Sequence, residues 1–145
     1  MTTTASRADG ARAAARGRTT LFSALAGLTA LAILLQGLWA GLFVPLGKGG
    51  QYQDTWVEVH AHGGEVATLL ALLTTAAAFF TLRQRREMWI GAGVLTVLLA
   101  LELYIGGMIS DDGVRTAAAI HIPLALAIMA LAVWLPVRAR YGARN

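Results

Sequence analysis

Cysteine is absent from the 145 residues, and charged side chains are scarce. Without cysteine the chain can form no disulfide, and thiolate chemistry and thiolate ligation of iron–sulfur clusters are excluded. Only 14% of the residues are charged and 57% are hydrophobic, which leaves too little polar surface for a soluble domain of this length. The sequence also lacks a glycine-rich phosphate loop, a nucleophile elbow and a zinc motif. The composition therefore points to a membrane protein.

The few charges are segregated along the chain. Residues 19–47, 66–82 and 116–137 carry none, and residues 88–110 carry only Glu102. Each run approaches or exceeds the ~20 apolar residues that cross a hydrocarbon core of ~30 Å, and a backbone inside a bilayer must be helical to satisfy its own hydrogen bonds. We therefore predict an all-α, four-transmembrane-helix bundle, with spans at about 21–44, 57–82, 88–109 and 116–137.

The distribution of lysine and arginine predicts the orientation. Ten of the twelve cationic residues lie before the first span, between spans two and three, or after span four; the exceptions are Lys48 and Arg115. The positive-inside rule makes that side cytoplasmic, so both termini are expected in the cytoplasm. We predict a disordered cytoplasmic tail at 1–18, a transmembrane domain at 19–138 and a short cytoplasmic tail at 139–145. The arginines on this side account for the +4 net charge, so no nucleic-acid partner is needed to explain it.

Two halves of the chain share a weak pattern that favours a repeated helical hairpin. Gln36 in the first span and Glu102 in the third each stand five residues before a glycine. Each is followed by a returning span with a histidine near its start, His60 in one half and His121 in the other. This pattern is typical of a duplication about an axis along the membrane normal.

Polar side chains gather in the outer half of the predicted bundle. At ~1.5 Å per residue, His60, His62 and His121 lie roughly 5–8 Å inside the outer boundary, and Gln36, Glu65 and Glu102 lie roughly 12 Å inside it. Ionisable groups in a span usually face the bundle interior. His60 and His62 cannot share a helix face, and the small-residue stripe beside His60 favours His60 as the inward residue. A stripe through Glu58, His62 and Glu65 would instead bring His62 inward, so His62 stays the alternative.

Three interpretations of this layer remain open. Two histidines on different helices at matching depth suit a bis-imidazole haem, with Gly63, Gly64, Ala117 and Ala118 leaving space for the porphyrin. A non-haem metal held by histidine and glutamate uses Glu65 and Glu102 better, but the expected Glu-x-x-His spacing is absent. In the third interpretation the polar side chains only hydrogen-bond between helices and fix their packing.

Four predicted spans with a histidine near the outer ends of the second and the fourth, His60 and His121, resemble one half of heme A synthase, a cytochrome b-type four-helix bundle. The pattern of Leu35-Gln36, Ala40-Gly41, His60-x-x-x-Gly64, Glu102, Gly106 and His121-Ile122-Pro123 is also similar to a small, uncharacterised four-helix membrane family common in actinobacteria. The resemblance covers about residues 21–137 and implies that His60 and His121 are axial ligands of haem b. The chain departs from heme A synthase in lacking a glutamate three residues before the first histidine, the arginine after it, and an outer cysteine pair. The resemblance therefore implies haem binding or electron transfer more than haem oxidation.

The sequence thus predicts a multi-pass plasma-membrane protein that binds haem b and handles electrons or haem near the outer face. His60 and His121 would hold the iron, while Gln36, Glu65 and Glu102 would tune its electrostatics or relay protons. No catalytic residue is identified. The alternative is a non-enzymatic accessory or structural subunit of a membrane complex. Besides the lipid bilayer, a second copy is a possible partner through Gly37-x-x-x-Gly41, although packing within the chain is the default expectation for that motif.

Overall fold

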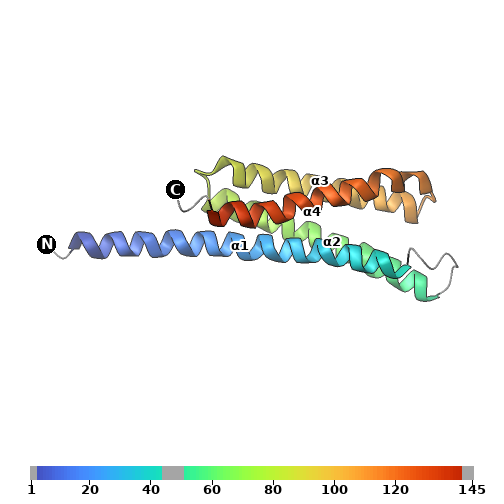
Figure 1. The fold of residues 1–145 in the computed structure, drawn as a ribbon, viewed down its shortest axis with the longest axis horizontal. Helices are drawn as coiled ribbons and strands as arrows, with labels where there is room; N and C mark the ends of the chain where they lie inside the picture. The colour runs from blue at the N-terminus through green and yellow to red at the C-terminus, as the bar shows by residue number, and fades with distance from the viewer. Residues whose placement is uncertain (1–2, 44–50, 142–145) are drawn as a thin grey trace.

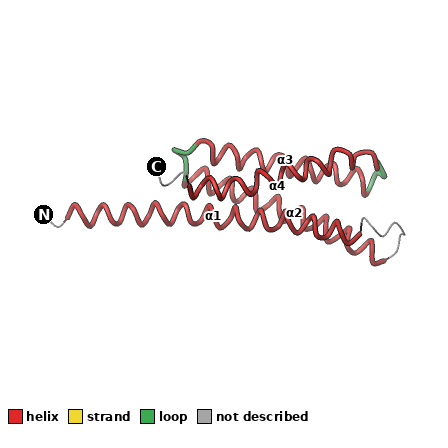
Figure 2. The backbone as a smooth tube through the Cα atoms, in the orientation of Figure 1, coloured by secondary structure: helices red, strands yellow, loops and turns green. Residues whose placement is uncertain are grey.

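A computed structural model describes residues 3–43 and 51–141 as a bundle of four long helices (Figure 1). The described residues contain no strand, so the predicted all-α fold is confirmed. Figure 2 shows that the green turns between the helices are short. The elements in chain order are α1 (Thr3–Phe43), α2 (Gln51–Thr81), α3 (Arg86–Ser110), the short 3₁₀ helix η2 (Arg115–Ala117) and α4 (Ala118–Tyr141).

Each long helix contains a segment that is long and apolar enough to cross a membrane, as the sequence predicted. These segments are Gly17–Phe43, Asp54–Thr81, Arg86–Ser110 and Arg115–Tyr141. They begin up to four residues before the predicted spans, since polar residues at a helix start continue the helix into the interfacial region. The start of α1 and the end of α4 lie towards the same end of the bundle (Figure 1). The assignment of that end to the cytoplasm, and of the membrane to the plasma membrane, stays a prediction from the arginine distribution.

The N-terminal segment differs from its prediction. Residues 3–18 are helical and continue α1 without interruption, whereas the sequence predicted a disordered tail. Alanine and arginine are strong helix formers, and an existing helix is extended more easily than a new one is nucleated. At the other end of α1, residues 44–50 lie outside the described residues, and these include half of the outer loop 45–56 between the first two predicted spans.

The helices form a four-sided arrangement. α1 packs against α2 and α4, and α3 packs against the same two helices, which places α2 and α4 on one diagonal. The diagonal matters because α2 and α4 carry the histidines singled out by the sequence. Any contact between those side chains must therefore cross the centre of the bundle.

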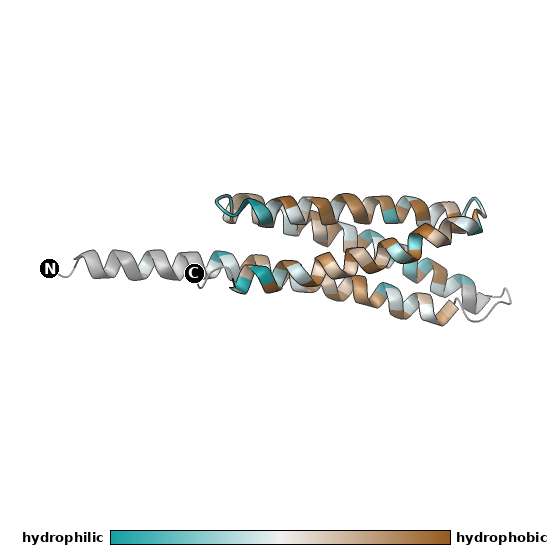
Figure 3. Ribbon diagram, turned by 45° about the horizontal axis from the view of Figure 1, so that its top comes forward, coloured by the Kyte–Doolittle hydropathy of each residue, from teal (hydrophilic) through white to brown (hydrophobic). Residues whose placement is uncertain are grey.

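Small residues fill much of the interior, and large apolar residues face outward. Ala71 and Ala78 on α2, Ala92 on α3 and Ala132 on α4 are buried, whereas many leucines and valines are exposed. Figure 3 shows brown along all four helices, with teal at the α2–α3 turn, near the end of α4 and at scattered positions in the other half of the bundle. Small interior residues let helices approach closely, and outward leucines suit a lipid environment.

Threonine pairs join the helices in the interior. The hydroxyl oxygens of Thr29 and Thr74 are 3.0 Å apart between α1 and α2, and those of Thr75 and Thr96 are 2.9 Å apart between α2 and α3. Thr29 and Thr74 also lie within hydrogen-bond distance of the carbonyl oxygens four residues earlier. A hydroxyl has a single proton, so in each pair one threonine donates across the interface and the other to its own helix.

Candidate functional site

Four polar residues, one from each helix, meet in the half of the bundle away from the termini. They are Gln36 on α1, His60 on α2, Glu102 on α3 and His121 on α4. His60 contacts Gln36, His121 contacts Glu102, and the two imidazole rings face each other. We refer to these four residues as the outer polar cluster, after the side of the membrane on which the arginine distribution predicts them to lie. The contact of Gln36 with His60 in the first helical hairpin corresponds to the contact of Glu102 with His121 in the second. A duplicated hairpin would give this correspondence.

The environment of His60 fixes which ring nitrogen is free. Its Nδ1 atom is 3.1 Å from the backbone carbonyl oxygen of Gln36. A carbonyl oxygen can only accept a hydrogen bond, so Nδ1 carries the proton and donates it. In the neutral ring, Nε2 is then left with a lone pair that can bind a metal or accept a proton.

His121 is held in a related way by a carboxylate. Its Nδ1 atom is 3.2 Å from Oε1 of Glu102, within ion-pair distance but without hydrogen-bond geometry. The side chains are only 20% and 12% exposed, respectively. An ionised Glu102 would call for the proton on Nδ1, and a protonated Glu102 would donate its own proton to Nδ1, so this contact is compatible with either tautomer of His121. Carboxylate–histidine pairs of this kind orient metal-binding imidazoles and raise their basicity.

Unsatisfied polar atoms concentrate in this cluster. Five buried side-chain atoms have no hydrogen-bond partner among the described residues, and four of them are Gln36 Nε2, both carboxylate oxygens of Glu102, and His121 Nδ1. Leaving such groups unpaired in an apolar interior costs about 1–3 kcal/mol each. Unpaired buried groups in a native protein call for an explanation, such as a strained functional site or a bound water or ion.

The two imidazoles meet across the bundle centre. Their ring centroids are 6.3 Å apart and their planes are inclined by 67°. The edge of Phe43 packs on His60 at a centroid distance of 5.5 Å. The rings are therefore close neighbours from diagonal helices. Nδ1 of His60 donates to α1, and Nδ1 of His121 lies beside the Glu102 carboxylate of α3 without a hydrogen bond.

The space beside the glycines is filled, which differs from the expectation. A Cβ atom added at Gly63 would collide with the indole of Trp39 and the amide of Gln36, and one added at Gly64 would lie 2.8 Å from Cδ2 of Leu103. The space beside these two glycines is occupied by side chains of α1 and α3, so no open cavity lies next to them within the described part of the chain. Ala117, in η2, is buried. The prediction that these small residues leave room for a porphyrin is therefore wrong for the arrangement of side chains seen here.

His62 and Glu65 lie away from the outer polar cluster. They are 78% and 66% exposed, and His62 Nδ1 is 3.1 Å from Glu65 Oε2 one turn along the outward face of α2. The structure thus favours His60 over His62 as the inward histidine. It does not place Glu65 beside the histidine pair, because Glu65 follows His62 by one helical turn and shares its face. The expectation that Glu65 tunes the site is corrected accordingly.

Gly37 and Gly41 also face outward, against the default expectation that they pack within the chain. Both are exposed, and a Cβ atom at either would find no described atom within 4 Å. Close packing in the chain instead uses Gly63 and Gly64 against Trp39 and Leu103. A tryptophan near the end of a span, such as Trp39, is ordinarily expected at the membrane interface. The adjacent glycines Gly63 and Gly64 were the sequence signal for this packing, since neighbouring glycines in a helix mark a place where another helix comes close.

Within the described ranges, no three histidine, aspartate or glutamate side chains gather closely enough to hold a metal ion. The groups brought together here are two imidazoles and one nearby carboxylate. Such groups can exchange protons, and an imidazole nitrogen with a lone pair can donate to a metal. Comparison with protein families, curated proteins and solved structures found no match to this chain.

Proposed function

We propose that this chain is an integral membrane protein that binds one b-type haem between His60 and His121 and passes electrons near the outer membrane face. The observation that carries the proposal is the imidazole pair. The rings come from diagonal helices and their centroids are 6.3 Å apart. Nδ1 of His121 lies 3.2 Å from the Glu102 carboxylate, and Nδ1 of His60 donates to the Gln36 carbonyl, so that Nε2 of His60 is available. This tautomer is the one that iron ligation through Nε2 requires.

His60 and His121 would hold the iron of the haem through their imidazoles, whose ring centroids lie 6.3 Å apart with planes inclined by 67°. Seating the porphyrin requires Trp39 and Leu103 to turn aside from Gly63 and Gly64. Both are side chains on neighbouring helices, so this change needs no break in a helix.

The protein groups around the rings would set the properties of the haem. A haem with two histidine ligands supplies a one-electron couple and leaves no coordination position for substrate. The Gln36 carbonyl polarises His60, and the carboxylate of Glu102 polarises His121. Electron donation from the rings stabilises the oxidised iron, so these two contacts favour a low potential. The position of the cluster towards the outer side favours a redox partner at that face.

The proposal is tested by the absorption spectrum of the detergent-purified protein after expression with ample haem. Dithionite reduction is expected to give sharp α and Soret bands. His60→Ala and His121→Ala should each abolish those bands, because each removes one axial ligand. His62→Ala is the matched control and should retain them, since His62 points outward. Circular dichroism of each variant checks that the helices are formed.

Two outcomes would overturn the proposal. A wild-type protein without these bands would leave the imidazole pair without a haem. Loss of the bands in His62→Ala, with retention in His60→Ala, would show that the wrong histidine was assigned.

A second candidate function is that of an accessory or structural subunit in which the cluster fixes helix packing. The filled space beside Gly63 and Gly64 favours this candidate, because the side chains of Trp39, Gln36 and Leu103 already occupy it. It predicts no haem bands, together with a lower unfolding temperature for His121→Ala. The same set of variants therefore distinguishes the two candidates.

A further inference from the structure

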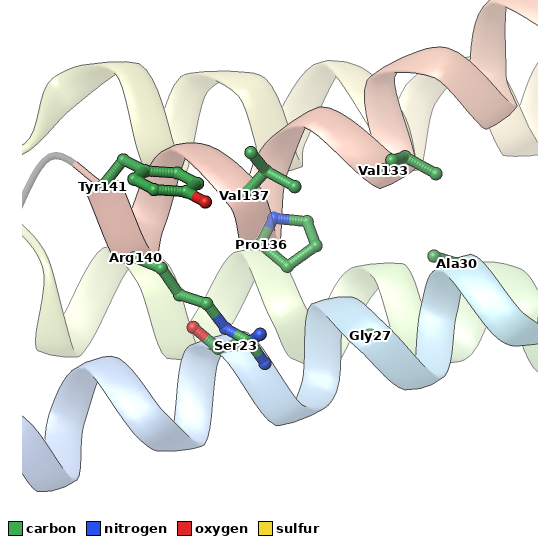
Figure 4. A pocket seen from close by; sticks show the side chains of 8 residues that line it. All are labelled: Ser23, Gly27, Ala30, Val133, Pro136, Val137, Arg140 and Tyr141. Atoms are coloured by element: carbon green, nitrogen blue, oxygen red, sulfur yellow. The ribbon is translucent and has the colours of Figure 1, made fainter.

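A groove runs between α1 and α4 at the opposite end of the bundle from the outer polar cluster. It encloses about 480 Å³ and is walled by Gly27 and Ala30 on α1 and by Val133 and Pro136 on α4. Figure 4 shows Arg140 extending from α4 towards α1, where Ser23 lines the same groove. The groove is therefore apolar along most of its walls, and one end carries the cationic Arg140 and the hydroxyl of Ser23.

Ser23 provides an independent sign that the polar end accepts a ligand. The residue is only 7% exposed, and its Oγ atom has no hydrogen-bond partner among the described residues. Six threonines of the same bundle behave differently, because each is within hydrogen-bond distance of the carbonyl four residues earlier. A buried hydroxyl left unpaired is unfavourable, and an acceptor brought into the groove would remove that penalty.

The positive charge of the arginines around the groove favours an anionic ligand. Arg140 lies at the end of the bundle where Arg83, Arg85, Arg86 and Arg138 are also found. The positive-inside rule assigns this end to the cytoplasmic leaflet, whose anionic lipids give a negative surface potential. Basic pockets between helices on this side suit phospholipid head groups, and an apolar channel beside the guanidinium suits an acyl chain.

We propose that the α1–α4 groove binds one anionic phospholipid of the cytoplasmic leaflet. Its phosphate lies against Arg140 and Ser23, and one acyl chain follows the apolar wall past Gly27. The guanidinium donates to the phosphate oxygens, and the Ser23 hydroxyl donates its otherwise unused proton. The groove is separate from the outer polar cluster, so this site does not depend on haem binding.

The test uses the full chain in a non-ionic detergent. Dimyristoyl phosphatidylglycerol, dimyristoyl phosphatidylcholine and inorganic phosphate are added separately, and thermal unfolding and native mass spectra are recorded. Phosphatidylglycerol is expected to raise the unfolding temperature and to remain as one bound molecule, because a ligand of the folded state stabilises that state. Phosphatidylcholine or phosphate alone should do neither. An equal effect of inorganic phosphate would overturn the lipid as occupant.

Two variants locate the site. Arg140→Gln should weaken phosphatidylglycerol binding about tenfold, as expected for loss of one charge-assisted contact. Arg138→Gln is the matched control, because it removes the same charge from the same helix end outside the groove. Equal losses in the two variants would show general charge attraction and overturn the site.

Gly27→Leu tests the acyl-chain part without altering charge. A Cβ atom at Gly27 meets no described atom within 4 Å, so leucine can enter the open groove without disturbing the helices. The variant should keep its helical circular dichroism and lose the bound phosphatidylglycerol. Undiminished lipid binding in Gly27→Leu would overturn the proposed path of the chain.

Discussion

The carboxylate of Glu102 lies 3.2 Å from the Nδ1 atom of His121, joining α3 to α4 inside the bundle. Neither carboxylate oxygen has a hydrogen-bond partner among the described residues. The equivalent position on α1 is the neutral Gln36, whose backbone carbonyl serves His60. The two histidines are therefore held by similar contacts of different charge, and this asymmetry gives Glu102 a distinct influence on any metal bound between the rings.

Glu102→Gln is expected to retain haem and to raise its reduction potential by tens of millivolts, where about 59 mV is a tenfold change for a one-electron couple. The amide keeps an acceptor oxygen near His121 but removes the negative charge that favours oxidised iron. A redox titration of the reduced α band measures the shift. Glu65→Gln is the control and should leave the potential unchanged, since Glu65 lies on the outward face of α2. A lower potential in Glu102→Gln would contradict the assigned role.

Gly63→Ala is expected to lower the stability of the bundle by about 1–3 kcal/mol, the usual penalty of overpacking. The added methyl group collides with Trp39 and Gln36, so α1 and α2 must separate or Trp39 must rotate. Gly37→Ala is the matched control, because an added Cβ there meets no described atom. It should leave stability unchanged or raise it slightly through better helix propensity. Unfolding by sodium dodecyl sulfate, followed by circular dichroism, compares the two, and equal stabilities would argue against the close approach of α1 and α2.

Thr29 and Thr74 should show energetic coupling in a double-mutant cycle. Replacing either with valine removes the hydroxyl while keeping a similar shape, and their shared hydrogen bond of 3.0 Å predicts a coupling of about 0.6 kcal/mol. A second cycle that combines Thr29→Val with Thr96→Val serves as control, because Thr96 pairs with Thr75. Detergent unfolding of the single and double variants measures both cycles. Coupling in the control cycle as large as in the first would contradict the pairing.

The helices were predictable because the apolar runs are long and the charges between them are few. A backbone in lipid has few alternatives to the helix, so length and hydropathy suffice to locate the spans. The choice of His60 over His62 was also open to sequence reasoning. The stripe of small residues on α2 contains Ala71 and Ala78, which are buried in the structure, and His60 lies close to that stripe.

The wrong expectation for Glu65 has a local physical reason. A carboxylate within a span is usually inward-facing, yet Glu65 is paired with His62 on its own helix face. Residues three apart on a helix can satisfy each other without turning towards the core. Sequence spacing gives the shared face of these two residues, but not whether that face points in or out.

The filling of the space beside Gly63 and Gly64 could not be predicted from the sequence. It depends on how α1 and α3 are rotated about their own axes, and helices of nearly uniform apolar composition do not specify that rotation. Trp39 is a tryptophan near the end of a span, where a place in the interfacial belt is the usual expectation. Only the packed bundle reveals that its indole covers Gly63.

Arg85 ties the α2–α3 turn to the end of α4, and its replacement is expected to loosen that end of the bundle. Its guanidinium donates to the backbone oxygens of Ala139 and Arg138 at 2.9 and 3.1 Å, and its Nε donates to Glu87 at 3.2 Å. The last carbonyls of a helix lack partners within the helix, so Arg85 satisfies groups that α4 cannot. Arg85→Ala should therefore lower stability by about 1–2 kcal/mol, as for loss of hydrogen bonds to a charged group.

Arg86→Ala separates this effect from loss of charge. Arg86 starts α3 in the same turn region and is exposed, so its removal takes away one positive charge and none of the contacts to α4. Each variant removes one arginine from the end of the bundle that is predicted to be cytoplasmic. The positive-inside rule therefore predicts the same membrane topology for both. Hydrogen exchange of the backbone amides in the last turn of α4 should rise in Arg85→Ala and stay near wild type in Arg86→Ala. Equal exchange in the two variants would mean that the α4 end is held by its own apolar packing, without help from Arg85.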